Sequence, residues 1–384
     1  MEHLSAANTQ FSLNLFKKLS GGNASKNVFY SPISISSALA MVSLGAKGNT
    51  AAQMFKVLGF TDPPKPGAAT PAPHVKEDQI HSSFNKLMSE LKKPGAPYVL
   101  SLANRLYGEQ SYQFVEKFLN DTKTYYKAEL EEVDFKKKSE AARVNINKWV
   151  EKNTQGELEK KFPKEATRDG QFKLNKTQTK PVKMMHQESK FPLAFIPEMN
   201  SQVLELPYVG KNLSMLIILP NKDSRRNHWP SEGETAQIIW CFSLFGILEK
   251  ALTYEKLMEW TKPSKMLQEQ VQVTLPRFKM EQTYDMKSLL ISMGMEDVFD
   301  DQKVNLSGMS PNNDLVVTKV IHKAFVEVNE EGTEAAAATG VVINVVTALK
   351  PEDPKTFIAD HPFLFFIRHN PSNSILFYGR FCSP

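Results

Sequence analysis

Apolar residues three and four positions apart predict amphipathic helices along much of the chain. In the first of them, Phe11, Leu15 and Leu19 share one helical face. Ser31 and Pro32 suit the N-cap and the first position of the second helix. The predicted helices are Ser5–Leu19, Ile33–Ala46, Asp78–Leu91, Phe114–Tyr126, Ser139–Val150 and Met286–Met293.

Short apolar runs, and stretches that alternate apolar with polar residues, predict strands between these helices. The longest alternation, Asp314–Asn329, is typical of a half-buried strand. The predicted strands are Asn27–Pro32, Tyr98–Tyr107, Ala128–Phe135, Leu213–Pro220, Val271–Phe278 and Asp314–Asn329. Residues 61–77 are rich in Pro and Ala and show neither the helical nor the strand periodicity of apolar residues. This composition predicts an exposed, disordered loop.

The residues after Asn329 have mixed preferences for secondary structure. Four alanines at 335–338 favour helix, whereas the valines and isoleucine at 341–346 favour strand. The extended, helical and looped conformations of such a segment have similar free energies. The segment is therefore either one that changes conformation or a flexible linker. If the preceding strand continued, Thr333, Ala335, Ala337 and Thr339 would share one face. That face is uniformly small, so it could slide over a packed core.

Composition narrows the class of protein. The 384 residues are 41% hydrophobic and 23% charged with a net charge of +5, which indicates a globular protein with an ample core. The basic runs Lys136–Lys138 and Lys160–Lys161 are either a weak polyanion-binding patch or solvated faces. We find no nucleic-acid motif. Cys241 and Cys382 are too few for a disulfide framework or a Cys-rich zinc site.

The sequence gives no indication of an enzyme. The eight histidines are scattered, and no nucleophile elbow, H-E-x-x-H motif, phosphate-binding loop or dinucleotide fingerprint occurs. We therefore expect no catalytic residues, no metal and no cofactor. The N-terminus has no charged-then-apolar leader, and no apolar run approaches the roughly 20 residues of a membrane span. We expect a cytoplasmic protein without a membrane partner, with release to the extracellular space as the alternative.

Two motifs carry a family resemblance. One is the sequence EEGTEAAAAT, and the other is the C-terminal pair Ala359–Arg368 and Leu376–Phe381. The chain resembles the serpin family, in its ovalbumin-type intracellular branch. The first motif matches the hinge of the reactive loop, which here is Glu330, Glu331, Gly332, Thr333, Glu334, Ala335, Ala336, Ala337, Ala338 and Thr339.

The resemblance implies a single-domain, monomeric α+β fold over residues 1–384, with three β-sheets, about nine helices and an exposed reactive-centre loop at 330–356. It also implies suicide inhibition of a serine protease. The protease attacks the loop and forms an acyl-enzyme, and the cut loop then inserts as a new strand of the main sheet. Counting from the hinge glycine places the scissile bond at Val346–Thr347, which suits an elastase-like pocket. Counting back from Phe357 places it at Leu349–Lys350, which suits a chymotrypsin-like protease. The family's central polar cluster, the shutter, corresponds to Ser31, Ser34 and His322.

Two departures from the family pattern qualify this expectation. After Gln155, about thirty residues of the pattern are missing, including a central strand of the main sheet. Residues 221–246 are atypical and are either a binding patch or sequence from a splice or gene-model variant. Because insertion needs two flanking strands, three hypotheses remain: a working inhibitor, a non-inhibitory serpin-like substrate or binding protein, and a defective variant.

Overall fold

The computed structural model describes residues 1–21, 25–61, 77–91, 93, 106–128, 130–134, 136–154, 167–174, 178–208, 210–221, 246–329 and 354–384. Its helices are α1 (Glu2–Ser20), α2 (Pro32–Ser43), α3 (Gly48–Val57), α4 (Glu77–Leu91), α5 (Glu116–Tyr126), α6 (Ser139–Thr154), α8 (Tyr254–Trp260) and α9 (Lys287–Ser292). Its strands are β1 (Val28–Tyr30), β2 (Leu106–Glu109), β3 (Leu130–Val133), β4 (Thr167–Lys173), β5 (Thr179–Ile196), β6 (Ser201–Pro207), β7 (Leu213–Pro220), β8 (Leu267–Pro276), β9 (Phe278–Asp285), β10 (Ile321–Val328), β11 (Lys355–Ile358), β12 (Phe363–His369) and β13 (Ser374–Phe381).

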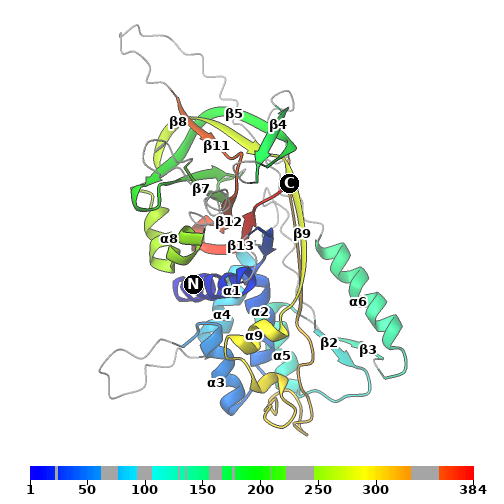
Figure 1. The fold of residues 1–384 in the computed structure, drawn as a ribbon. Helices are drawn as coiled ribbons and strands as arrows, with labels where there is room; N and C mark the ends of the chain where they lie inside the picture. The colour runs from blue at the N-terminus through cyan, green and yellow to red at the C-terminus, as the bar shows by residue number, and fades with distance from the viewer. Residues whose placement is uncertain are drawn as a thin grey trace, which may run out of the picture.

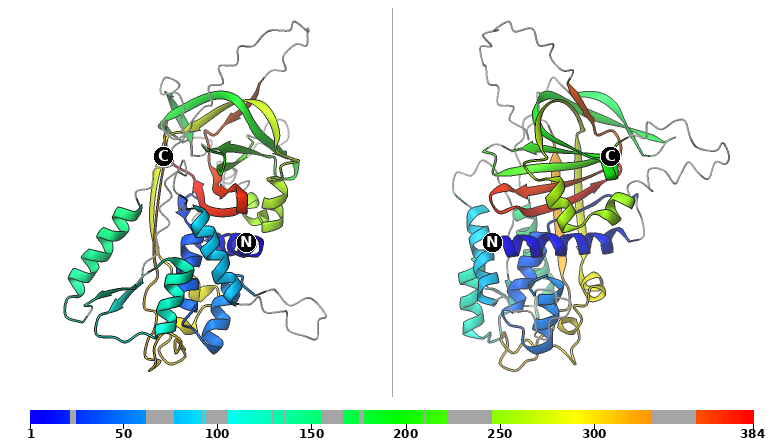
Figure 2. Two further views of the ribbon diagram at one scale, coloured as in Figure 1. Left: turned by 180° about the vertical axis from the view of Figure 1, so that it is seen from behind. Right: turned by 90° about the vertical axis from the view of Figure 1, so that its left-hand side faces the viewer.

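The largest sheet has nine strands, in the order β1-β13-β12-β7-β6-β5-β8-β11, with β4 paired to β5. The long strand β5 joins its two halves, because residues 184–193 pair with β8 and residues 193–196 pair with β6. Figures 1 and 2 show this sheet at one end of the molecule and the helices α1 to α5 at the other. The β10–β9 ribbon runs along one side of both, with α6 on its outer side.

Two further sheets are small. Strands β10 and β9 form an antiparallel pair in which Ile321 lies opposite Asp285 and Val328 lies opposite Phe278. Strands β2 and β3 form a parallel pair. Within the described residues, no strand joins these two pairs. In the described part of the chain, the strands expected in the main sheet therefore form two separate pairs, and no described strand occupies the position of the expected missing strand.

Aromatic side chains fill the core of the large sheet. Phe29 stacks between Phe365 and Phe377, with ring centroids 5.9 and 5.4 Å away. The ring of Phe365 lies against Gly379 so closely that a Cβ at this glycine would overlap the ring. Because protein cores are closely packed, a side chain larger than hydrogen does not fit at Gly379 unless the ring moves. This packing fixes β13, which contributes to the polar cluster described below.

Most predicted elements are confirmed, two strands have different bounds, and one strand lies mostly outside the described residues. Only Ile321–Val328 of the predicted strand Asp314–Asn329 is a strand, because the segment before it bonds elsewhere: the Val317 N–H donates to Val298 O. The predicted strand at 271–278 crosses the boundary between β8 and β9 at Arg277. Of the predicted strand at 98–107, residues 98–105 lie outside the described residues. The predicted loop at 61–77 and the atypical stretch 221–246 lie almost wholly outside them as well.

None of the helices in the described part of the chain combines the length and the apolar character that crossing a membrane requires.

Candidate functional site

The segment that contains the predicted reactive loop is anchored at both ends on two consecutive strands, β8 and β9. Its N-terminal end follows β10, which pairs with β9. Its C-terminal end leads into β11, which pairs in parallel with β8. A single residue, Arg277, separates β8 from β9. The predicted hinge 330–339 and both predicted scissile bonds, Val346–Thr347 and Leu349–Lys350, lie outside the described residues.

At the start of β10, the end away from the loop, the structure brings together Ser31, Ser34 and His322, the three residues of the predicted shutter. Ser31 is the N-cap of α2, where its Oγ accepts the Ser34 N–H at 3.3 Å and lies 3.1 Å from Ser34 Oγ. The same Oγ donates to the Leu376 carbonyl of β13 at 2.8 Å. The Ser31 N–H donates to Nε2 of His322 at 3.0 Å. One serine thus links the start of α2 to β13 and to β10.

The chemistry of His322 follows from its burial. Its side chain lies on the inward face of β10, and the residue is 8% exposed. Burial disfavours the charged ring and lowers the pKa of His322 from 6.5 to about 4. Because Nε2 accepts the Ser31 N–H, the proton of the neutral ring resides on Nδ1. Protonation of Nε2 would remove the acceptor that holds β10 against the start of α2.

A tyrosine on the adjacent strand, opposite His322, was not expected from the sequence. Tyr284 lies opposite His322 in the β10–β9 register, and its hydroxyl accepts the Phe29 N–H at 3.3 Å. Burial raises the pKa of this hydroxyl. The ribbon is therefore held to the β1–α2 junction at two neighbouring positions. The alternation of Phe278, Met280 and Tyr284 is the signal that could have revealed β9 and this tyrosine.

The second edge of β10 matters most for loop insertion. The inward residues His322, Ala324, Val326 and Val328 are buried, so the ribbon is packed on the body of the protein. Only β9 pairs with β10 among the described residues, and α6 lies near β10 without forming a strand pair. Where a second flanking strand is expected, the described structure supplies none.

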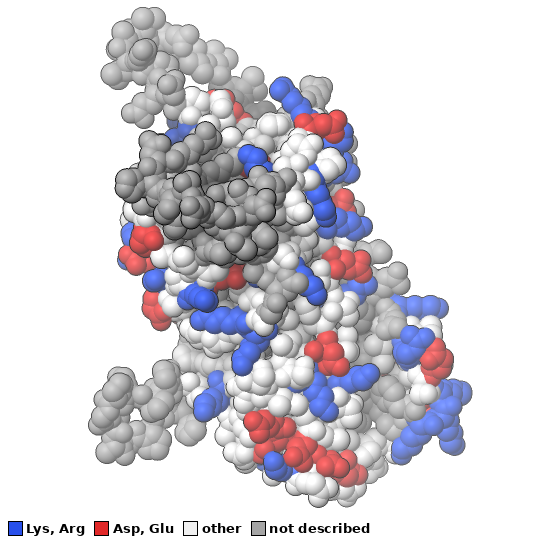
Figure 3. All heavy atoms as spheres, in the orientation of Figure 1, with Lys and Arg blue, Asp and Glu red and all other residues white. Residues whose placement is uncertain are grey.

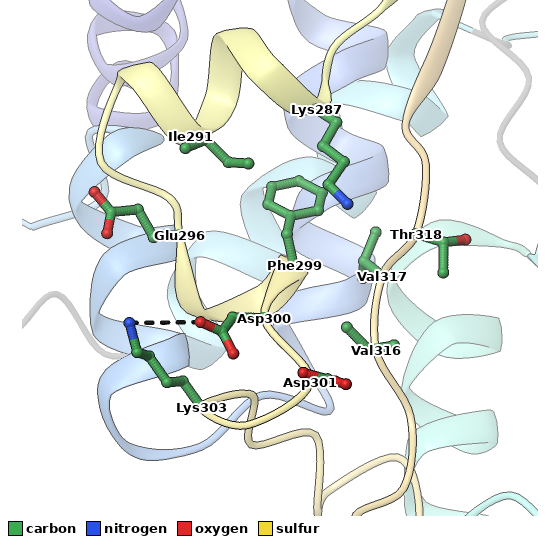
Figure 4. A pocket seen from close by; sticks show the side chains of 10 residues that line it. All are labelled: Lys287, Ile291, Glu296, Phe299, Asp300, Asp301, Lys303, Val316, Val317 and Thr318. Carbon is green, nitrogen blue, oxygen red and sulfur yellow. Dashed lines mark ion pairs between the residues drawn. The ribbon is translucent and has the colours of Figure 1, made fainter.

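The pocket drawn in Figure 4 lies apart from this cluster. It has a volume of about 550 Å³ and lies between α9 and the segment that leads into β10. The Lys287 ammonium lies 5.8 Å from the ring centre of Phe299, and Lys303 pairs with Asp300 at 3.4 Å. No group of three or more His, Cys, Asp and Glu side chains that could hold a metal occurs in the part of the chain that the structure describes. On the face shown in Figure 3, positive and negative side chains are interspersed, and the predicted polyanion patch remains a prediction.

Comparison with known proteins decides the family. The model of the family "Serpin (serine protease inhibitor)" matches residues 6–160 and 155–384. The chain belongs to the serpin family. The leukocyte elastase inhibitor of Equus caballus is 47% identical over 411 residues, and that of Homo sapiens is 45% identical, each with complete coverage of both chains. The family is described as one of serine protease inhibitors rather than of enzymes.

Solved structures confirm the serpin fold. The structure of "a tumour suppressing serpin" at 2.1 Å has a TM-score of 0.81 and 31% identity, with complete coverage of both chains. Uncleaved ovalbumin has a TM-score of 0.80 and 34% identity over 99% of this chain and 100% of that chain.

The comparisons are consistent with an interruption of the family pattern in this chain. The family model matches in two separate segments that overlap at 155–160, directly after Gln155, where the missing strand is expected. The alignments with the elastase inhibitors span 411 positions and this serpin has 384 residues, so about 27 positions hold no residue of this chain.

Proposed function

We propose that this serpin is an inhibitor of serine proteases that presents residues 330–356 as bait. The observation that carries the proposal is the hinge sequence Glu330–Thr339, which directly follows a strand packed in the body of the protein and precedes a segment anchored on β8. The complete coverage by relatives named leukocyte elastase inhibitor supports the same function.

The proposed reaction begins as ordinary proteolysis. The protease serine attacks the carbonyl carbon of Val346, and the Val346–Thr347 bond breaks as the amine of Thr347 takes a proton and leaves. The acyl-enzyme then links the protease to Val346. Insertion of the small-faced hinge beside β10 would carry the protease away from the position in which water can deacylate it. A branched aliphatic residue at 346 suits an elastase-like pocket, whereas cleavage at Leu349–Lys350 would indicate a chymotrypsin-like target.

A second candidate function is favoured by the divided main sheet. An inserted strand needs hydrogen-bonding partners at both edges, and a buried backbone group without a partner costs about 1–3 kcal/mol. Within the described residues, β10 offers one edge and no second strand lies ready beside it. In this case the protease cuts the loop, the acyl-enzyme deacylates, and the serpin is consumed as a substrate.

One experiment separates the two candidates. The purified protein is mixed with neutrophil-type elastase, and in parallel with chymotrypsin, and run on a denaturing gel. A covalent band that joins both chains supports inhibition, and a cut serpin without such a band supports the substrate function. An intact loop after prolonged incubation would contradict both.

Two matched variants test the cleavage register. Val346→Asp places a charge in the elastase pocket and should abolish cleavage by elastase, whereas Leu349→Asp should leave that cleavage largely intact. The opposite pattern would place the bond at Leu349–Lys350. Action inside the cytoplasm, release to the extracellular space, the monomeric state and the absence of a cofactor remain predictions.

A further inference from the structure

The turn between β11 and β12 contains a histidine that the proposed function does not use. His361 lies in this turn, directly after Asp360 and before Pro362. A residue that precedes proline is restricted to extended backbone conformations, so the direction of its side chain is largely fixed. The side chains of Asp360 and His361 are each 13% exposed. We call the contact of Lys173, Pro220, Asp360 and His361 the turn joint.

Two strands from elsewhere in the fold bind this turn. Nε2 of His361 donates to the carbonyl of Pro220, the last residue of β7, at 2.6 Å. Nδ1 of His361 lies 2.9 Å from Oδ1 of Asp360. Lys173, the last residue of β4, donates its N–H to the Asp360 carbonyl at 2.7 Å, and its ammonium lies 3.4 Å from Oδ2 of Asp360. Because β7 is buried along its whole length, these bonds fix the turn to the core of the protein.

The partners of the ring determine which protonation state completes the turn joint. The Pro220 carbonyl and the Asp360 carboxylate can only accept hydrogen bonds. Both ring nitrogens of His361 must therefore donate, which requires the doubly protonated, charged ring. The neutral ring has one N–H, so it keeps one of the two bonds and directs a lone pair toward the other acceptor. The charged groups of the joint are the Asp360 carboxylate, on the turn itself, and the Lys173 ammonium of β4, whereas β7 contributes a backbone carbonyl.

The turn joint lies at the C-terminal end of β11, which is the base of the proposed bait. This strand is four residues long, and β8 is its one strand partner among the described residues. At its start, Lys355 pairs with Glu269 at 2.6 Å. After its end, the Ala359 N–H donates to Thr274 O at 2.9 Å, and the chain then enters the joint. A strand with so few backbone bonds opens locally unless contacts at its ends hold it.

We propose that His361 is a positioning residue for the bait. Its doubly protonated ring completes the turn joint and fixes the base of residues 330–356, and the loss of one proton loosens that base. The inference rests on the proposed function for its effect on a protease, whereas the effect on β11 is measured without one. A fixed base reduces the number of conformations that the bait loses when a protease binds it. We therefore expect faster cleavage of the bait while the ring is charged.

Two variants each remove one contact of the ring. The amide nitrogen of His361→Gln reaches the position of Nε2, so it retains the donor to Pro220 and loses the donor to Asp360. The amide nitrogen of His361→Asn occupies the position of Nδ1, so it retains the donor to Asp360 and loses the donor to Pro220. Neither amide titrates in the accessible range. The matched control is His186→Gln, because His186 lies on β5 of the same sheet and its Nδ1 bonds to Thr274 Oγ1 at 3.0 Å rather than to the turn.

The first measurement is hydrogen exchange of the intact, uncut protein at about pH 6 and about pH 8, followed by mass spectrometry and corrected for the intrinsic exchange rate at each pH. In the native protein we expect exchange over Lys355–Ala359 to be about tenfold slower at the lower pH, because that is the smallest effect of losing a hydrogen bond to a charged group. Both His361 variants should exchange at the faster rate at both pH values, and His186→Gln should behave as the native protein does. Exchange that neither His361 variant changes, or a pH response that persists in both, would overturn the inference.

The second measurement is the kcat/KM for cleavage of the bait by elastase at the same two pH values. The ratio of the native value to that of a His361 variant cancels the pH dependence of the protease itself. We expect this ratio to be about three or more at the lower pH and to fall toward one at the higher pH. A ratio of one at both pH values would show that the turn joint does not position the bait.

The two measurements separate this inference from the proposed function. Exchange that follows the expected pattern in a protein whose bait elastase does not cut would support the fixing of β11 by His361 and contradict the proposed function. Covalent complexes that form at the same rate in the native protein and in both His361 variants would support the proposed function and contradict the positioning role of His361.

Discussion

The pH dependence of stability at His322 offers a quantitative test of the polar cluster. We replace His322 with Gln, which cannot titrate in the accessible range and whose amide oxygen can still accept the Ser31 N–H. In the native protein the ring has a pKa of about 4, compared with 6.5 for an unperturbed histidine. Between these values the unfolded chain binds the proton more tightly than the folded one. The histidine's contribution to stability is therefore fully present above pH 6.5 and is lost as the pH falls to 4.

Linkage gives the size of the effect. The free energy of unfolding of the native protein should fall relative to that of His322→Gln by about 1.4 kcal/mol from pH 7.5 to 5.5. The loss should reach about 2.5 kcal/mol at pH 4.5. We measure the free energy of unfolding of both proteins by urea unfolding at these three pH values, monitored by tryptophan fluorescence. The difference between the two proteins removes the contributions of the other titrating groups, which both share. A difference that stays constant with pH would refute the buried, neutral state of His322 and its bond to Ser31.

Three further substitutions test the packing around this cluster by urea unfolding at pH 7. Glu249→Ala leaves the fully buried guanidinium of Arg380 without the carboxylate that lies 2.9 Å from its Nη1, and it should cost about 3 kcal/mol; a cost below 1 kcal/mol would contradict a buried pair. Gly379→Ala inserts a methyl group into the ring of Phe365 and should cost about 2 kcal/mol or more; a neutral result would show that the core has room there. Ser31→Ala removes the N-cap of α2 and should cost about 1 kcal/mol, and an unchanged stability would argue against that cap.

Local patterns predicted individual helices and strands well where the signal was strong, whereas the fold and the residues of the polar cluster were expected from the family resemblance. The N-cap pair Ser31 and Pro32 placed the start of α2, and the apolar run of β7 placed a buried strand. The patterns overextended the strand that ends at Asn329, because alternation persists through residues whose backbone groups bond to a neighbouring turn. Alternation reports the burial of side chains, and it does not report where a backbone hydrogen bond goes.

The features that local patterns did not predict depend on contacts between residues far apart in the sequence. The link from Ser31 to the carbonyl of Leu376 joins residues 345 positions apart and uses a backbone oxygen, which every residue has. No side-chain pattern encodes such a contact. Tyr284 was missed because β9 was not recognised as a strand. The absence of one central strand was predicted from the family pattern, because the motif that the family carries after Gln155 does not occur in this sequence.

The most direct test of the account is the reaction of the purified protein with neutrophil-type elastase, followed on a denaturing gel and by mass spectrometry of the released C-terminal fragment. We expect a covalent complex of the two chains and a released fragment that begins at Thr347. Complete cleavage without any covalent complex would contradict inhibition by this serpin, and cleavage confined to sites outside 330–356 would contradict the assignment of the bait itself.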